Sequence, residues 1–168
     1  KEIISFFSGL NGKKIVDVGC GKGRFLKILR EKTSSCEFYG VDISEEILKF
    51  CPSYVKTIQG SILNMDFPDN FFDYVYSVEV LEHSLIIENA IKEMCRILKP
   101  KGKIIIIDKN IKQLWRLKVQ PWEQWFSPKD IITLLRKYNV EANYKFVAYE
   151  KRSQPDGLFI AWEGIKNV

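Results

Sequence analysis

The residues best suited to chemistry in this chain begin with three closely spaced glycines. Gly19, Gly21 and Gly23 directly follow the apolar run Lys14–Val18 and precede a stretch with helical spacing. Glycines let the backbone approach a ligand closely, and the free N–H groups at a helix N-terminus attract a negative group. This segment therefore indicates a site for a nucleoside-containing ligand.

Two aspartates accompany the glycines. Asp42 ends the next apolar run and is placed to accept hydrogen bonds from two ribose hydroxyls, while Asp17 lies two residues ahead of the first glycine. The dinucleotide fingerprint Gly-x-Gly-x-x-Gly needs a glycine where this chain has Arg24. The spacing therefore argues against an NAD site.

The chain has one histidine, His83, and two glutamates stand close to it at Glu79 and Glu82. His83 could act as a general base, because its ordinary pKa lies near neutrality. Alternatively, the three side chains could share one face of a helical turn and hold a divalent metal that polarises a hydroxyl. In a third interpretation, narrowly favoured, His83 packs structurally at a strand–helix junction. We therefore list the three as candidate catalytic residues and assign no metal ligand.

The elements that must position these residues alternate between strand and helix, which predicts an α/β fold with a doubly wound, mostly parallel sheet. Strands are predicted at 14–18, 37–41, 54–59, 72–77 and 103–108, and helices at 1–10, 24–31, 45–50, 85–98 and 129–138. The strand at 103–108 is apolar on both faces and should be central. Two further strands, 140–150 and 158–165, are joined too closely for a helical crossover and should pair antiparallel.

Composition limits the class of protein. The 168 residues carry 26 Lys and Arg against 21 Asp and Glu, and 46% are apolar, which predicts one domain spanning 1–168. No apolar run approaches the ~20 residues of a membrane span, and no leader is evident. The four cysteines form no Cys-x-x-Cys pair, so we expect reduced thiols and a cytoplasmic protein.

Several segments resemble the class I S-adenosylmethionine-dependent methyltransferases of the small-molecule type. The matching segments are Val16–Gly23, Gly40–Ser44, Phe72–Ser77, Val80–His83 and Arg96–Gly102, and the similarity continues through Phe126–Pro128 into the final strand pair. The resemblance implies a Rossmann-like sheet of seven strands and S-adenosyl-L-methionine as the cofactor.

The resemblance also implies a set of cofactor contacts. The glycine loop, including Cys20, would wrap the methionine part, Asp17 would orient the loop and the ammonium group, and Asp42 would bind the ribose. The full implied set is Asp17, Gly19, Cys20, Gly21, Gly23, Asp42, Ile43, Ser61, Ile62 and Ser77.

The adenine side of this set is less firmly defined. Ile43 would flank the adenine, and Ser61 and Ile62 would contact its edge and face, while Ser77 would line the methionine end. Core packing is an equal alternative for both isoleucines. Many relatives have Asp where this chain has Ser61, which puts the adenine contact there in doubt.

The Glu-x-x-Glu-His segment resembles the metal site of small-RNA 2′-O-methyltransferases and a similar segment of ubiquinone-pathway O-methyltransferases. The RNA family adds a second, downstream histidine, and this chain has none.

The acceptor is expected to meet the segments around the fifth strand. Lys92–Lys118 holds nine basic residues against two acids, and Trp115, Trp122 and Trp125 follow within Ile111–Phe126. Such a segment could meet an anionic or aromatic small molecule, a nucleic acid or an acidic lipid surface, or it could simply be solvated.

The leading hypothesis is methyl transfer to an oxygen or nitrogen of a small-molecule acceptor. The alternatives are an RNA methyltransferase, acting on a 2′-oxygen or a base, and a cofactor-binding scaffold without turnover. Nucleic acid is less favoured because no dedicated RNA-binding module is evident. The oligomeric state stays open.

Overall fold

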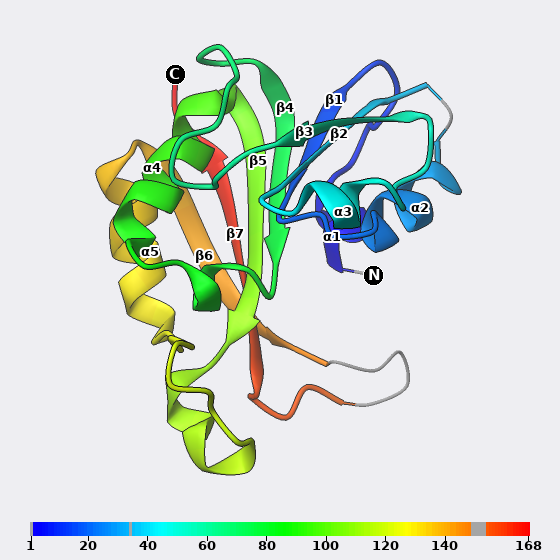
Figure 1. The fold of residues 1–168 in the computed structure, drawn as a ribbon. Coiled ribbons are helices and arrows are strands. Elements are labelled where there is room, and N and C mark those ends of the chain that lie inside the picture. The colour runs from blue at the N-terminus through cyan, green and yellow to red at the C-terminus, as the bar shows by residue number, and fades with distance from the viewer. Residues whose placement is uncertain (1, 34, 149–153) are drawn as a thin grey trace.

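The computed structural model describes residues 2–33, 35–148 and 154–168 (Figure 1). Its strands are β1 (Lys14–Val18), β2 (Glu37–Asp42), β3 (Val55–Gln59), β4 (Phe72–Val78), β5 (Leu98–Lys109), β6 (Val140–Val147) and β7 (Phe159–Lys166). Its helices are α1 (Glu2–Phe6), α2 (Arg24–Arg30), α3 (Glu45–Leu48), α4 (Ile87–Ile97) and α5 (Pro128–Lys137), with short 3-10 turns η1 (Leu81–His83) and η2 (Ile111–Arg116).

The strands form one 7-stranded sheet in the order β3-β2-β1-β4-β5-β7-β6. Neighbours from β3 to β5 are parallel, and β7 runs antiparallel to both β5 and β6. The predicted doubly wound, Rossmann-like α/β sheet with an antiparallel C-terminal pair is therefore confirmed.

The order of the strands reverses at β1, which lies between β2 and β4. Because β1, β2, β4 and β5 are parallel, the loops that follow them leave from the same edge of the sheet, which we call the carboxyl edge. The opposite side is the amino edge. Ligands of such sheets bind at the carboxyl edge, where the strand order reverses.

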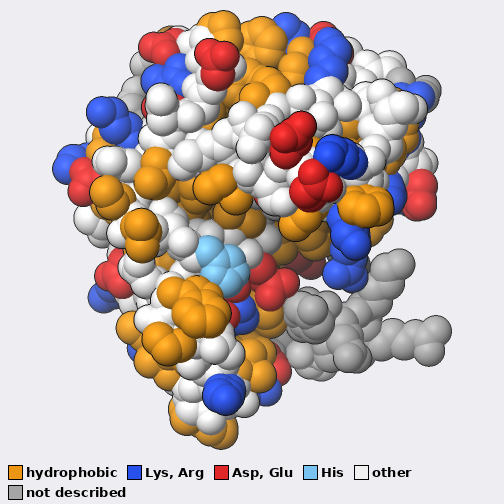
Figure 2. Space-filling model, in the orientation of Figure 1, with side chains coloured by type: hydrophobic (Ala, Val, Ile, Leu, Met, Phe, Trp, Pro, Cys, Tyr) orange, Lys and Arg blue, Asp and Glu red, His pale blue; other side chains and the backbone are white. Residues whose placement is uncertain are grey.

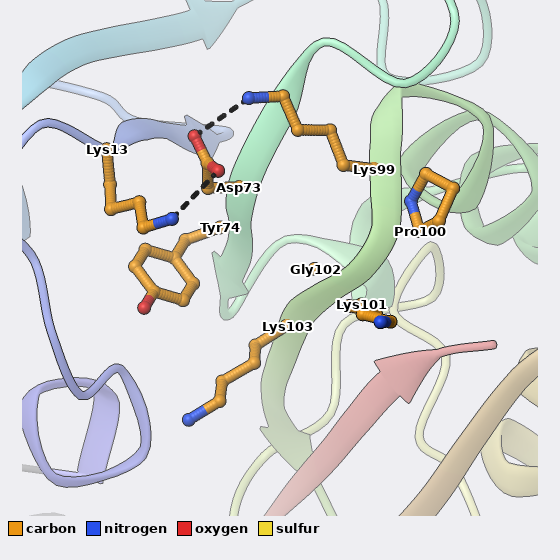
Figure 3. A pocket seen from close by; sticks show the side chains of 8 residues that line it. All are labelled: Lys13, Asp73, Tyr74, Lys99, Pro100, Lys101, Gly102 and Lys103. Carbon is orange, nitrogen blue, oxygen red and sulfur yellow. Dashed lines mark hydrogen bonds and ion pairs between the residues drawn. The ribbon is translucent and has the colours of Figure 1, made fainter. Parts of the chain in front are cut away.

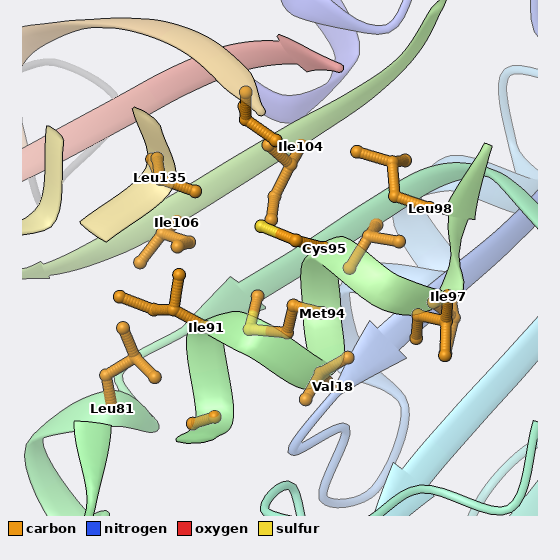
Figure 4. Close-up of a cluster of buried hydrophobic side chains, with 14 of the residues drawn as sticks. Val18, Leu81, Ile91, Met94, Cys95, Ile97, Leu98, Ile104, Ile106 and Leu135 are labelled. Atoms are coloured by element: carbon orange, nitrogen blue, oxygen red, sulfur yellow. The ribbon is translucent and has the colours of Figure 1, made fainter. Parts of the chain in front are cut away.

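Helices cover both faces of the sheet (Figure 1), and each face has its own hydrophobic cluster, of which Figure 4 shows the one beside α4. One cluster joins the sheet to α4 and α5, with Ile91 and Leu135 fully buried, and the other joins it to α1 and α2. Strand β5 supplies Ile104 to the first cluster and Ile105 to the second, both at 0% exposure. The predicted central position of this strand is confirmed.

Strand β5 begins five residues earlier than predicted. Leu98, the first residue after α4, already pairs with Phe72 across an irregularity in the register. The gap between the predicted helix 85–98 and the predicted strand 103–108 is thus part of the strand, as a distortion in which Lys101 adopts a φ of 63°. The strand was predicted to start only at residue 103 because Pro and Gly in the preceding Lys-Pro-Lys-Gly sequence are typical of turns.

The first helix is shorter than the predicted 1–10. It ends at Phe6, and Gly9 follows with a φ of 71°. The helix predicted at 129–138 is confirmed and begins at Pro128, after Ser127, which forms a reciprocal capping box with Asp130. The end of the strand predicted at 140–150 partly lies outside the described residues. None of the described helices is both long and apolar enough to cross a bilayer.

Candidate functional site

The glycine loop after β1 is held against β2. The N–H groups of Gly19 and Cys20 both donate to the carbonyl of Val41, at 2.8 and 2.9 Å. Gly19 has a φ of 79°, and a Cβ built on it would lie 2.3 Å from a methyl group of Val80. Backbone conformation and close packing therefore both require glycine here.

Asp42 connects the loop to the N-terminus of α3. Its Oδ2 accepts from the Gly21 N–H at 2.9 Å, and its Oδ1 accepts from the Ser44 N–H at 3.0 Å. A carboxylate has about four acceptor positions, so two remain for other donors. The side chain thus both shapes the loop and keeps capacity for a pair of hydroxyls.

Several buried side-chain oxygens near the carboxyl edge form no hydrogen bond of good geometry with the described residues. They include Oδ2 of Asp17, near the end of β1, the hydroxyl of Tyr76 and Oγ of Ser77, both inside β4, and Oγ of Ser84. Burial raises the pKa of Asp17 to about 8; the adjacent Tyr76 hydroxyl opposes this shift, and the charge of Asp42 adds to it. An unpaired buried acceptor costs free energy unless a ligand satisfies it.

The residues expected around the adenine differ in their surroundings. Ile43 is 74% exposed, which excludes core packing and leaves its side chain free to flank a ligand. Ile62 is partly buried and packs against the α4 cluster, so its packing role is present. Ser61 is half-buried, and its Oγ accepts from the Leu63 N–H at 3.2 Å.

An acidic cluster built around one lysine lies at the carboxyl ends of β4 and β5. The Lys109 ammonium contacts the Glu82 carboxylate directly and lies 3.7 Å from Oε1 of Glu79. Asp108 is fully buried, and its carboxyl accepts from the N–H groups of Glu82 and Lys109 at 3.2 and 2.8 Å. Burial raises the pKa of Asp108 to about 8, and the charge of Glu82 reinforces this shift.

Glu79 is the residue of this cluster most available to a ligand. It is half-buried, with a side chain 34% exposed, and its φ of 55° is rare for a residue with a Cβ. Burial raises the pKa of its carboxyl, although the Lys109 charge opposes the shift. Residues with strained backbone conformations are often found at functional sites, and Glu79 lies at the carboxyl edge of the sheet.

His83 is separated from Glu79 and approaches Glu82 instead. Its Nε2 lies 3.3 Å from Oε1 of Glu82, and its side chain is 50% exposed. The three residues that the metal interpretation would group do not converge: the described group with ligand atoms within 4.8 Å of one another is Glu82, His83 and Glu123. Because Lys109 already neutralises Glu82, this group is less suited to a cation.

Comparison with known proteins identifies the family. The model of a family described as "Methyltransferase domain" matches residues 16–106, which include the glycine loop, Asp42, Glu79 and Glu82 and end just before Asp108 and Lys109. The chain belongs to this family.

Curated relatives extend the similarity over more of the methyltransferase domain. A tRNA (carboxymethyluridine(34)-5-O)-methyltransferase of Arabidopsis thaliana is 30% identical over 76% of this chain and 34% of its own length. A demethylmenaquinone methyltransferase of Geobacillus is 36% identical over 58% of this chain and 45% of its own length. The chain thus spans less than half the length of these relatives.

Solved structures show the same fold. A SAM-dependent methyltransferase from Methanosarcina mazei superposes with a TM-score of 0.80 over 99% of this chain and 97% of its own, at 18% identity. This likeness confirms the Rossmann-like architecture of the methyltransferase domain.

The residues present fit S-adenosylmethionine. Asp17 offers a buried carboxyl, beside the Tyr76 hydroxyl, for an ammonium group, Asp42 keeps free acceptor positions for ribose hydroxyls, and exposed Ile43 can cover a base. The positive-φ glycines keep the surface above the loop free of side chains. The structure brings these positions to one edge of the sheet, whereas Cys20 is buried with its thiol directed at the Gly21 carbonyl.

Sequence reasoning missed Asp108, Lys109 and Glu123. The first two stand at the carboxyl end of the central strand, where parallel sheets place ligand-contacting residues, so their position was a usable signal. Glu123 gave no local signal, because only the fold brings it beside Glu82 and His83.

A pocket at the amino edge of the methyltransferase domain lies away from all these residues (Figure 3). It is lined by Lys13, Asp73, Tyr74, Lys99, Pro100, Lys101, Gly102 and Lys103. Asp73 is paired there with Lys13 at 3.4 Å and Lys99 at 3.1 Å. Its acid is therefore already neutralised by the protein itself.

Proposed function

We propose that this domain transfers a methyl group from S-adenosylmethionine to an oxygen or nitrogen of a small-molecule acceptor. The observation that carries this proposal is the position of Glu79, a half-buried carboxylate on strained backbone at the same edge as the glycine loop and Asp42. This edge therefore combines a cofactor cradle with a group that can take a proton.

Each residue has a defined part in this proposal. The bound cofactor supplies an activated methyl group with a neutral thioether leaving group. The loop and Asp42 fix its orientation, and alignment is the main source of rate in such a displacement. Glu79 accepts the proton that an acceptor hydroxyl or protonated amine must lose.

Lys109 has a positioning part. Its ammonium pairs with the Glu82 carboxylate and lies 3.7 Å from the Glu79 carboxylate, which it orients. The carboxyl of Asp108 accepts hydrogen bonds from the backbone N–H groups of Glu82 and Lys109 and so fixes their positions. Burial opposes the charge on Lys109, but the Glu82 carboxylate outweighs burial and raises the lysine pKa. Glu79 can thus gain a proton while Lys109 stays charged.

Exposed apolar side chains in the segments that follow β4 and β5 favour a small apolar or aromatic acceptor. Trp115 and Trp122 are 81% and 64% exposed, and Leu85 beside His83 and Ser84 is 86% exposed. One relative is named as a demethylmenaquinone methyltransferase. Exposed apolar walls at the mouth of a site suit an apolar or aromatic ligand.

An RNA acceptor is the second candidate, because one relative is named for tRNA. The basic run at 92–118 supports it less than its charge suggests. Arg96 pairs with Glu93 and Asp69, Lys99 with Asp73, and Lys109 with Glu82. The run also reaches both edges of the sheet, so its cations do not form one phosphate-binding surface.

Transfer of radiolabelled methyl from S-adenosylmethionine into a cell extract tests this function. After incubation, the extract is separated into nucleic-acid, protein, lipid and small-molecule fractions, and mass spectrometry of the labelled product reads the methylated atom. Label in the small-molecule or lipid fraction on oxygen or nitrogen is the expected result.

Other outcomes contradict the proposal. Label in RNA would support the second candidate, and label on carbon would leave the acceptor class but change the atom. Cofactor binding without label in any fraction would favour a scaffold without turnover.

A further inference from the structure

The segment after β5 forms a projecting lobe, which we define as residues 111–122. Its base is closed by backbone hydrogen bonds: the Ile111 N–H donates to Phe126 at 3.0 Å, and the Phe126 N–H donates to Lys109 at 3.2 Å. Trp125 and Phe126 at this base are buried, whereas none of the residues of η2 is buried. The lobe is thus anchored firmly but leaves its own side chains outside the core.

The surface of the lobe is strongly apolar. Besides Trp115 and Trp122, it exposes Ile111, Leu114 and Leu117, each between 41% and 46%. Figure 2 shows hydrophobic side chains gathered over this projection, directly below the single histidine in that view. Contiguous exposed apolar surface of this kind marks an interaction site.

Cations alternate with these apolar residues. The lobe contains Lys112, Arg116 and Lys118, and the sequence from 109 to 122 contains no Asp or Glu. Arg116 pairs with Asp156 at 2.8 Å, whereas Lys112 and Lys118 form no ion pair with the described residues. The two lysines therefore give the apolar lobe a positive charge.

This mixture points to one class of occupant. The cores of protein–protein interfaces are depleted in lysine, whereas basic segments that carry tryptophan are typical of helices and loops lying in the headgroup region of a bilayer. Anionic headgroups attract juxtamembrane lysine and arginine, and tryptophan prefers the interfacial layer.

The lobe also lies beside the acidic cluster, where the methyl acceptor is proposed to bind. Gln124, just past it, donates from its N–H to the Glu82 carbonyl and from its amide to the Ser84 carbonyl, both at 2.8 Å. Two more exposed apolar residues, Leu85 and Ile86, follow Ser84 directly. An external surface that binds the lobe would therefore lie next to the acidic cluster.

We propose that the lobe docks this domain on an anionic lipid bilayer, from which an apolar acceptor reaches the site. The delivery of the acceptor rests on the proposed function, but the docking does not. It requires only that the tryptophans enter the headgroup layer while the lysines meet anionic headgroups.

Co-sedimentation of the full chain with lipid vesicles tests the docking, without cofactor or acceptor. Vesicles of phosphatidylcholine alone are compared with vesicles that also contain phosphatidylglycerol. We expect binding to the anionic vesicles, weaker binding in high salt, and a loss of about tenfold or more in the Trp115→Ser, Trp122→Ser double variant.

A matched pair of variants supplies the control. Leu117 in the lobe and Ile165 on β7 are 46% and 45% exposed, and Ile165 pairs with Lys103 at the amino edge. Leu117→Ser should weaken vesicle binding, and Ile165→Ser should not. Circular dichroism and cofactor affinity, which should be unchanged in all variants, establish that they are folded.

Three results would overturn the docking: no binding to anionic vesicles, equal losses in Leu117→Ser and Ile165→Ser, or a self-association of the chain that the tryptophan substitutions abolish. The last result would make the lobe a protein interface. Methyl transfer to acceptors in detergent micelles is measured separately, so that failure of the enzyme and failure of the docking are told apart.

Discussion

The two edges of the sheet differ in how completely the protein satisfies their polar groups. At the amino edge, the partly buried Asp73 accepts from the Lys14 N–H at 3.0 Å and pairs with Lys13 and Lys99. At the carboxyl edge, Glu82 and Asp108 have protein partners, whereas Oδ2 of Asp17 and Oγ of Ser77 are buried without a hydrogen bond of good geometry among the described residues. A network that the protein completes by itself stabilises the fold, whereas one that it leaves open is built for a ligand.

Positive φ angles occur at both edges. The carboxyl edge holds three positive-φ glycines and Glu79 at a φ of 55°, while the amino edge holds Gly12, Asn70 at 56° and Lys101 at 63°. Strain at the carboxyl edge coincides with unpaired polar groups, and strain at the amino edge does not. The combination, rather than strain alone, distinguishes the site.

Glu79→Gln should have the largest effect, because it removes the proposed proton acceptor from the carboxyl edge. We expect kcat to fall by about 10²–10⁴-fold while cofactor affinity changes little. In the wild type, kcat/KM should fall as the pH drops through the raised pKa of Glu79, since the base must be ionised.

His83→Asn is the comparison variant. If His83→Asn removes the activity and Glu79→Gln retains it, the histidine is the base and our assignment is wrong. If neither changes kcat, the reaction needs alignment alone.

Gly19→Ala should weaken cofactor binding by about tenfold to a hundredfold, because the new Cβ both strains the backbone and meets Val80. Gly9→Ala is a matched control. Gly9 has a φ of 71° and nothing within 4 Å of its added Cβ. Gly9→Ala should lose about 1–2 kcal/mol of stability from the left-handed backbone alone. Gly19→Ala should lose more, because its Cβ also clashes with Val80. Denaturant unfolding measures both losses, and calorimetry should show that only Gly19→Ala loses affinity.

Asp17 should make cofactor binding release protons. Burial holds the pKa of its carboxyl at about 8, so it is protonated near neutral pH until a cation arrives. We expect roughly one proton to be released at pH 7, because a neighbouring ammonium favours the carboxylate. Titration calorimetry in buffers of different ionisation enthalpy measures this number, and Asp17→Asn should bring it to zero.

The same shift affects the stability of the ligand-free protein. Because the pKa in the folded state, about 8, exceeds the ordinary value of 3.8, the folded state binds more protons. Its stability should therefore fall as the pH rises from about 4 to about 8. In the calorimetric titration, cofactor binding to the wild type without proton release would contradict the placement of an ammonium beside Asp17.

Asp73→Asn should have the smallest effect and act on stability alone, by about 1 kcal/mol. Burial by itself would raise the pKa of Asp73, but the Lys14 N–H and the Lys99 ammonium outweigh it and lower the pKa. The stabilisation is therefore present above the unfolded pKa and lost as the pH falls through the lower folded value. Urea unfolding at neutral and acidic pH measures it.

The fold and part of the candidate site were predictable from the sequence. The alternation of strands and helices determined the parallel sheet, and the spacing of the glycines before Arg24 argued against a dinucleotide. Ile43, for which packing and ligand contact were equal alternatives, proved exposed, and Ile62 proved partly packed. Side-chain burial of this kind depends on the tertiary fold, which local pattern does not contain.

The acidic cluster shows the limit most clearly. Helical spacing suggested that Glu79, Glu82 and His83 share a face, but the left-handed backbone at Glu79 turns it away from the 3-10 turn. Lys109 and Glu123 come from positions 27 and 41 residues after Glu82, and only the sheet and the loop after β5 bring them there.

The most direct test of the difference between the edges is a calorimetric titration of the wild type, Asp42→Ala and Asp73→Asn with S-adenosylmethionine. The wild type and Asp73→Asn should bind with equal affinity. Asp42→Ala should lose about 1.5–3 kcal/mol, since charged hydrogen bonds to the ligand and to the loop are removed. Equal affinity of Asp42→Ala and the wild type, or loss of binding in Asp73→Asn, would contradict the placement of the cofactor at the carboxyl edge.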